Sequence, residues 1–430
     1  MKVCVCVVAI VATGLPYSRA AAAAEKGAVR TLTIQEAVDE AVQRNLGLLA
    51  QRASLSVAEA NVVTARLRPN PVVSGGANSL DWLGTGFNDI NGAGPQEYAV
   101  RVDVPFERAR KRALRTELAD QGKQIAVAQF AEAVRRVKLD VVLASIDVLE
   151  AKARLQLAED NLQALERLVQ LNERRLTSGA IAPLEVSRSR VAMLQYRGNV
   201  RSAQLALTEA RLKLLPLLGS KPDETAVDID DRLGLTPPVG SPDLAALQQA
   251  ARLARPDILA AQREQARTQA DLRLQIAQGK VDYALGAEYR RQQGVNGRGN
   301  LLGLFFSAPL PVFNRNQGEI ARAEAECDKA ARSLTALETD LAGEVASAYE
   351  EFDASRLLLI DIERDLLAPT TDARAGTTYM YQAGATSLLD VLDAQRAYND
   401  TMGTYYTAQA AYRRAQARLA LVVGQEMLHD

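Results

Sequence analysis

The sequence predicts a mainly α-helical protein with a β-barrel part, built from two copies of one structural unit. Three observations support this fold class: an internal repeat, apolar spacing that continues through very long helices, and four short segments in which apolar and polar residues alternate. Each unit is expected to contain a helix, a β hairpin and a long helical hairpin. The expected organisation is a signal peptide at 1–24, a first repeat at 25–219, a linker at 220–242, a second repeat at 243–424 and a tail at 425–430.

The internal repeat is clearest in the long helices. Apolar or small residues recur at alternating steps of four and three through 126–169, and the same pattern returns 204 positions later, apart from Ser355 and Pro369. Both copies contain one irregular four-four step, which locally unwinds a heptad supercoil. A second match, at an offset of 205, pairs Gly179 with Gly384. A fixed offset across both blocks indicates duplication of one unit.

The expected helices are too long for a compact globular domain. The opening helices are expected at about 31–68 and 243–279, the long helices at 107–176 and 314–378, and the return helices at 183–218 and 386–424. About 70 residues at 1.5 Å per residue give roughly 105 Å. The apolar stripe that runs along such a helix needs partner helices over its whole length. The sequence therefore predicts a coiled-coil bundle or helical tunnel.

Four segments alternate with the period of two that is typical of strands, and they form the expected hairpins 72–106 and 281–311. In the clearest segment, apolar residues from Tyr98 to Phe106 alternate with Arg101 and Asp103. One apolar and one charged face is the pattern of a transmembrane barrel, although a soluble hairpin packed on helices is the alternative. Open sheet edges are not tolerated in lipid, so a four-stranded protomer must oligomerise. Three copies would supply a 12-stranded barrel.

The N-terminus has the composition of a secretory signal. Lys2 is followed by an apolar run and then by small residues at Ala20–Ala24, where cleavage is expected. No other stretch approaches 18 uninterrupted apolar residues, so no membrane-spanning helix is expected. Lys and Arg total 51 against 52 Asp and Glu, a balance that gives no electrostatic footprint for nucleic acid.

Side chains that carry catalysis or bind metals are scarce. The single histidine, His429, lies beside the C-terminus, and Cys327 would be the one cysteine left after signal removal. The sequence has no nucleotide-binding glycine fingerprint and no Cys/His cluster of metal-site spacing. We therefore expect a protein that is not an enzyme, with no cofactor and no metal site.

Over residues 31–424 the chain resembles the outer-membrane efflux protein family, the TolC-type exit ducts. The segment 309–320, PLPVFNRNQGEI, resembles the heavy-metal cation-efflux (CzcC-like) branch. The resemblance implies a homotrimer in the outer membrane of a Gram-negative bacterium, with its barrel in lipid and its helical tunnel in the periplasm. It also implies a periplasmic adaptor, an inner-membrane pump of the resistance–nodulation–division type, and passive export, with divalent metal cations as candidate substrates. A periplasmic coiled-coil scaffold or adaptor without a pore is the alternative.

The resemblance also implies functional residues at the two helix-hairpin tips. Asp390 and Asp393 match an aspartate pair that lines the periplasmic entrance, and their i, i+3 spacing places them on one helix face; a solvated pair near a helix N-terminus is the alternative. Tyr381 matches a gate tyrosine. Thr386 stands where some members carry a gate arginine, so closure would depend on packing and carboxylate repulsion. Adaptor docking is expected at Arg175, Leu176, Ser178, Gly179 and Gly384, with a plain helix-reversal turn as the alternative for the first tip.

Overall fold

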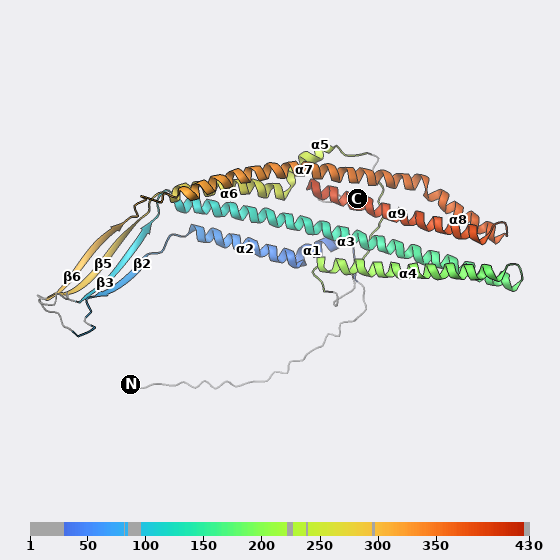
Figure 1. The fold of residues 1–430 in the computed structure, drawn as a ribbon, viewed down its shortest axis with the longest axis horizontal. Helices are drawn as coiled ribbons and strands as arrows, with labels where there is room; N and C mark the ends of the chain where they lie inside the picture. The colour runs from blue at the N-terminus through green and yellow to red at the C-terminus, as the bar shows by residue number, and fades with distance from the viewer. Residues whose placement is uncertain are drawn as a thin grey trace, which may run out of the picture.

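A computed structural model describes residues 30–80, 82–84, 96–221, 227–237, 240–294 and 297–424. The expected signal peptide and the C-terminal tail lie outside these ranges. The described part is long and narrow, with a four-stranded sheet at one end and two helical tips at the other (Figure 1).

The elements follow the same order in both halves of the chain, except that the long helix of the second half is divided into two. The first half contains β1 (Arg30–Leu32), α1 (Ile34–Arg44), α2 (Leu46–Arg66), β2 (Val72–Asn78), β3 (Glu97–Phe106), α3 (Lys111–Thr177) and α4 (Pro183–Leu217). The second half contains β4 (Val227–Ile229), α5 (Leu244–Ala254), α6 (Pro256–Gln278), β5 (Tyr283–Gly294), β6 (Gly297–Ser307), α7 (Gln317–Asp365), α8 (Leu367–Gln382) and α9 (Leu388–Val423).

Several helices are divided more finely than the spacing suggested. The helix expected at 31–68 is split at Asn45, whose side chain accepts a hydrogen bond from the Leu48 N–H and caps α2. The long helix expected at 314–378 ends at Asp365 and resumes as α8. Pro369 then lies in the first turn of α8, the part of a helix that tolerates proline. The helix expected at 243–279 is divided as well: α5 ends at Ala254 and Pro256 begins α6, where the first helical position tolerates proline.

The larger sheet is antiparallel, in the order β2-β3-β5-β6. Its register places Val100, Tyr289 and Leu302 side by side on one face. That face is apolar and exposed: Tyr98, Val100, Val102, Val104, Phe106, Leu285, Tyr289, Leu302, Leu304 and Phe306. The opposite face holds ion pairs, among them Arg101 with Asp103 at 2.7 Å. In the described part of the chain, no further strand pairs with the outer edges of β2 and β6.

A second, small sheet pairs β1 with β4 in parallel, in the segment that sequence analysis treated as a linker. Strands of three residues are too short to show a period of two, so no alternation in the sequence indicated β4. The Asp228 carboxylate in β4 accepts hydrogen bonds from Lys152 at 3.0 Å and from Arg211 at 3.3 Å. The two cations attach the small sheet to α3 and α4.

The apolar core runs between the helices. One cluster joins α1, α3, α4 and the small sheet around Val141, Ile146 and Leu214. Another joins α7 and α9, where the Phe352 and Tyr412 rings lie 5.6 Å apart. None of the described helices combines the length and the apolar character needed to cross a membrane.

Candidate functional site

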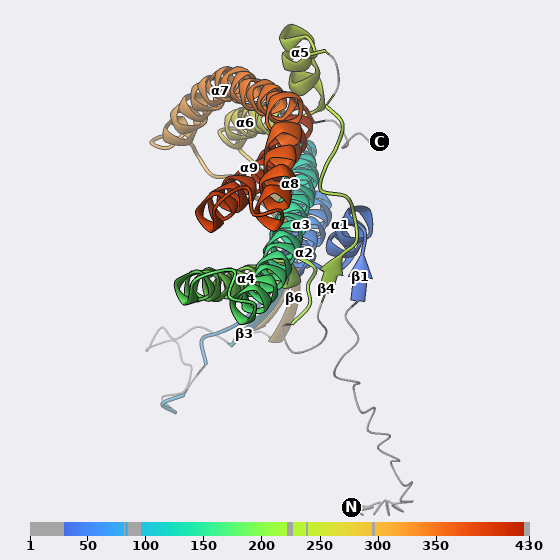
Figure 2. The same ribbon diagram turned by 90° about the vertical axis from the view of Figure 1, so that its right-hand side faces the viewer.

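The two helical tips, α3–α4 and α8–α9, are built by the same turn and lie side by side when the molecule is viewed toward that end (Figure 2). Gly179 and Gly384 adopt φ values of 74° and 79°. The N–H that follows each glycine donates at 2.8 Å to the carbonyl of Arg175 or of Met380, as in a Schellman motif. An added Cβ would meet nothing within 4 Å at either position, so the backbone conformation is what requires glycine.

A capping box opens α9. The Ser387 hydroxyl accepts from the Asp390 N–H at 3.3 Å, and the Asp390 carboxylate accepts from the Ser387 N–H at 3.0 Å. The Thr386 hydroxyl donates to the same carboxylate at 2.6 Å. These bonds, with that from Thr386 the largest, lower the pKa of Asp390 below its ordinary value. Thr386, which stands where some members of the resembled family carry an arginine, therefore holds the Asp390 carboxylate by a hydrogen bond.

Asp390 and Asp393 occupy the first turns of α9, and both are exposed. Asp393 lies 3.4 Å from Arg396, an exposed contact that contributes little to stability. Asp390 has a clear structural role as a cap, which agrees with the alternative of a solvated pair favoured by the helix N-terminus.

Tyr381 joins three helices at the tips. Its side chain is 3% exposed and packs with Leu165, Leu388 and Val391. The phenol donates to Asn172 Oδ1 on α3 at 2.8 Å and lies 3.3 Å from the Glu185 carboxylate on α4. Burial, reinforced by the charge of Glu185, raises the pKa of Tyr381. The phenol therefore stays a proton donor at physiological pH.

Arg175 crosses from the first tip to the second. Its guanidinium donates to the carbonyls of Tyr381 at 3.1 Å and Gln382 at 2.6 Å, and it lies 5.1 Å from the centre of the Tyr381 ring. A cation on the last carbonyls of a helix satisfies acceptors that have no helical partner. Arg175 thus closes the end of α8. Leu176 is partly exposed and Ser178 and Gly179 are exposed beside it, as is Gly384 on the second tip.

Sequence reasoning missed the buried polar side chains that connect the two hairpins. Asn161 accepts from Gln395 at 2.8 Å and donates to Asn399 at 2.8 Å, both on α9. Asn161 and Asn172 are fully buried. Both continue the four-three spacing of the apolar seam around Leu165, so polar residues at seam positions were the available signal.

In the described part of the chain, no three His, Cys, Asp or Glu side chains lie together as a candidate metal site. The tips instead combine exposed carboxylates with a buried tyrosine contact between hairpins. This arrangement can hold two helical hairpins together and present negative charge at their ends.

The comparisons with known proteins agree with this architecture. Residues 37–220 and 247–425 match the family model "Outer membrane efflux protein". The cobalt-zinc-cadmium resistance protein CzcC of Cupriavidus metallidurans is 26% identical over 394 residues, covering 90% of each chain. Among solved structures, CusC superposes with a TM-score of 0.75 at 19% identity over 92% of each chain. The outer-membrane channel OprN gives 0.74 at 21% identity, over 92% of this chain and 90% of its own.

Because the family model matches most of the chain, the chain belongs to the outer membrane efflux protein family, whose members are outer-membrane channels of Gram-negative bacteria.

Proposed function

We propose that the chain is one protomer of a homotrimeric exit duct that conducts substrates passively, with no chemical step of its own. The observation that carries this proposal is the four-stranded sheet, which has one exposed apolar face, one charged face and two open edges. Membership of a channel family supports a duct over the alternative of a periplasmic scaffold or adaptor.

The open edges favour a closed assembly. A sheet whose apolar face meets lipid cannot leave backbone N–H and C=O groups unpaired there. Pairing β6 of one protomer with β2 of the next removes every edge, and three copies give 12 strands, which lies in the known range for barrels. The face that carries Arg101 and Asp103 would then line the water-filled interior.

Cysteine cross-linking tests the closure. In a Cys327→Ser background, Gly75→Cys on β2 is combined with single cysteines scanned over 301–305 on β6. Disulfides form only when Cα atoms approach within about 7 Å, so one or two neighbouring positions are expected to yield covalent species of up to three chains. As a control, Val100→Cys on the internal strand β3 replaces the β2 cysteine and is expected to give no product between chains. A ladder that continues beyond three chains, or a scan with no product, would refute the closed trimer.

At the opposite end, Asp390 and Asp393 of three protomers would place six carboxylates around one entrance, an arrangement that favours cations. Tyr381, held by Asn172 and Glu185, would keep the hairpins of each protomer together. Asp393→Asn is expected to weaken block by divalent cations in bilayer recordings. Ser387→Ala, which removes a cap and no charge, serves as its control; equal block in both variants and the parent would exclude Asp393 from the constriction.

The partners follow from the family. Channels of this kind work with a periplasmic adaptor and an inner-membrane pump, and we infer a pump of the resistance–nodulation–division type. Ser178, Gly179 and Gly384, which are exposed, and the partly exposed Leu176 offer the adaptor a surface at the tips, and Arg175 stabilises that surface through its bonds to the end of α8. Similarity to a cobalt-zinc-cadmium resistance protein favours divalent metal cations as substrates. Deletion of the gene is expected to sensitise cells to these metals more than to common antibiotics; the reverse ranking would contradict a metal substrate.

A further inference from the structure

The connections between the sheet and the helices carry a group of exposed basic side chains. The four connections are 67–71, 107–110, 279–282 and 308–316, and each contributes at least one cation, with one more at the start of α3. We call these six residues the basic collar: Arg68, Arg108, Arg110, Arg112, Lys280 and Arg315.

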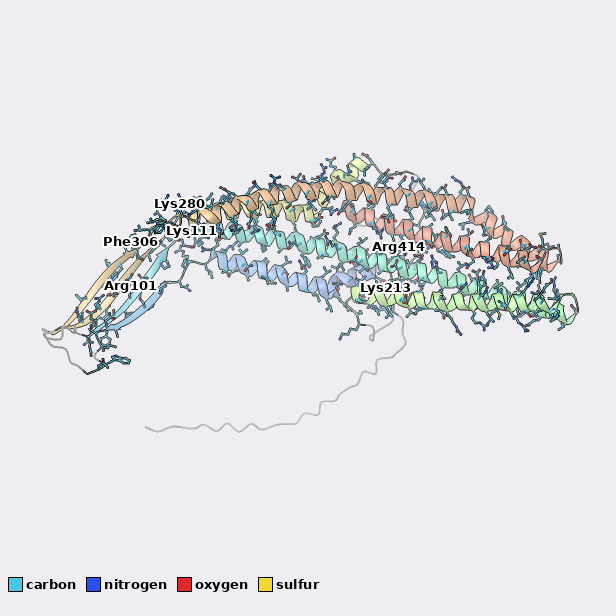
Figure 3. The ribbon with its side chains drawn as sticks, viewed as in Figure 1. Arg101, Lys111, Lys213, Lys280, Phe306 and Arg414 are labelled. Carbon is cyan, nitrogen blue, oxygen red and sulfur yellow. The ribbon has the colours of Figure 1, made fainter. Side chains whose placement is uncertain are left out.

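Direct contacts place the four connections at one level of the molecule. The Lys111 ammonium, at the start of α3, donates to the Lys280 carbonyl at 2.7 Å. Arg115 donates to the Leu67 carbonyl at 3.1 Å. An added Cβ on Gly279 would lie 2.7 Å from the Arg315 carbonyl oxygen. Lys111 and Lys280 accordingly lie together where the strands meet the helices (Figure 3).

The collar carries an excess of positive charge. The two carboxylates of the connections are already paired, Glu107 with Arg115 at 2.6 Å and Asp282 with Lys111 at 2.7 Å. Within the described ranges, none of the six collar side chains forms an ion pair with a carboxylate. In the part of the chain that the structure describes, six exposed cations therefore have no carboxylate as a counter-charge.

Helix stability does not explain this charge. Arg110, Lys111 and Arg112 occupy the N-cap and the first two positions of α3, whose first turn holds no acidic residue. The helix dipole disfavours a cation there by roughly 0.3–1 kcal/mol each. By contrast, α9 begins with Asp390 in its first turn, which the dipole favours. An anion bound beside the collar would offset the cost at α3.

An aromatic row lies next to the collar on the apolar face of the sheet. Tyr283 is 5.5 Å from Phe106 and 6.0 Å from Phe306, measured between ring centres, and Tyr283 is the first residue of β5. Aromatic side chains concentrate at the level of lipid headgroups in membrane proteins. Leu310 and Phe313, in the connection from β6 to α7, are 84% and 92% exposed. The cations thus adjoin surfaces that suit acyl chains.

We propose that the basic collar binds the phosphate groups of anionic phospholipids in the membrane leaflet that faces the helices. This inference rests on the proposed function, which places the sheet in the outer membrane. A lipid fits better than a free anion because it satisfies the cations and covers the neighbouring apolar side chains with one molecule. Each cation near an anionic membrane surface contributes about 1 kcal/mol, or about fivefold in affinity.

Native mass spectrometry of the full-length channel purified in detergent tests the proposal. The channel is titrated with phosphatidylglycerol, with zwitterionic phosphatidylethanolamine and with inorganic phosphate. The wild type is expected to retain phosphatidylglycerol at least tenfold more strongly than phosphatidylethanolamine, with no competition from millimolar phosphate and with loss of the preference in high salt. Equal retention of the two lipids by the wild type would overturn the proposal without any variant.

Variants locate the site. Arg108→Gln, Arg110→Gln and Arg112→Gln together are expected to weaken phosphatidylglycerol retention by about 100-fold, at about fivefold per charge. The same three positions changed to lysine should keep most of it. The control changes three exposed cations on the helices, Arg201→Gln, Lys213→Gln and Arg332→Gln, and is expected to leave retention unchanged. Equal losses in the glutamine variant and the control would refute a site at the collar.

The experiments distinguish failure of the lipid-binding proposal from failure of the proposed duct. A heat-modifiable trimer in the outer-membrane fraction that shows no lipid preference would refute the collar and leave the duct intact. A soluble periplasmic monomer would refute the duct, and the collar with it.

Discussion

The hydroxyl of Tyr381 is a single group whose removal should loosen the contact between the two hairpins. Tyr381→Phe keeps the ring in its apolar cluster and deletes the bond to Asn172 Oδ1, 2.8 Å in the parent. Asn172 is fully buried, and its Nδ2 has no partner in the described structure, so the variant leaves both polar atoms of the amide without a partner. Leaving one such atom unsatisfied costs about 1–3 kcal/mol.

That free energy sets the expected population of separated tips. A cost of about 1–3 kcal/mol corresponds to roughly a 5–150-fold rise in the open population. Hydrogen exchange at the backbone N–H groups of Gly384 and Ala385, which close the turn of the second tip, should accelerate by a similar factor. In bilayer recordings the same variant is expected to spend more time in high-conductance states.

Two variants make this reasoning refutable. Tyr379→Phe is the matched control, because Tyr379 lies on the same helix and is 73% exposed; its exchange should equal that of the parent. Tyr381→Phe combined with Asn172→Leu removes both polar partners and should recover much of the lost stability. Identical exchange in the parent and Tyr381→Phe, or no recovery in the double variant, would show that the phenol does not hold the tips.

Three further predictions concern the turn, the sheet junction and pH. Gly179→Ala, at φ 74°, should destabilise the first tip by about 1–2 kcal/mol, whereas Gly343→Ala, at an open site inside α7, should stabilise the protein by up to about 1 kcal/mol; thermal unfolding distinguishes them. Lys111→Met should lower the free energy of unfolding by about 1–3 kcal/mol because it leaves Asp282 without its cation. An unchanged melting temperature would show that this ion pair does not stabilise the protein. Because folding lowers the pKa of Asp390, its cap stabilises α9 fully above the ordinary aspartate pKa near 3.8, and this stabilisation is lost as pH falls through the lower folded pKa. Hydrogen exchange at the α9 N-terminus should therefore rise only below about pH 4. A rise near pH 6 would contradict this assignment.

For Tyr381, whose pKa is raised, stability changes with pH in the opposite direction. A phenol whose pKa is higher in the folded state contributes stability below its ordinary value near 10 and loses it as pH rises through the folded value. Neither group titrates between pH 5 and 9, so the tip contacts should not respond to physiological changes of pH.

Local signals in the sequence predicted the parts of the fold that local rules determine. Alternation predicted the two faces of the sheet, and Gly179 and Gly384 marked the two helix-hairpin tips. Contacts between distant segments gave no such signal. The strand β4 pairs with β1 at the other end of the first repeat, and three residues are too few to show a period.

The candidate site was predicted in its positions and only partly in its contacts. Tyr381 and Asp390 were named, but the partners that hold them, Asn172 and Thr386, depend on how two hairpins meet in space. Arg175 was expected at the adaptor-docking tip, which stays a prediction, and the contact of its guanidinium with the end of α8 was not predicted. A side chain's direction at a tip depends on packing that residue spacing does not contain.

Ion conduction by the purified protein tests the central claim most directly. Reconstituted into a planar bilayer under a potassium chloride gradient, the wild type is expected to give discrete channel steps and a reversal potential that shows preference for potassium over chloride. A stably folded chain that inserts into the bilayer and conducts nothing, or conducts with chloride preference, would contradict a duct with carboxylates at its entrance.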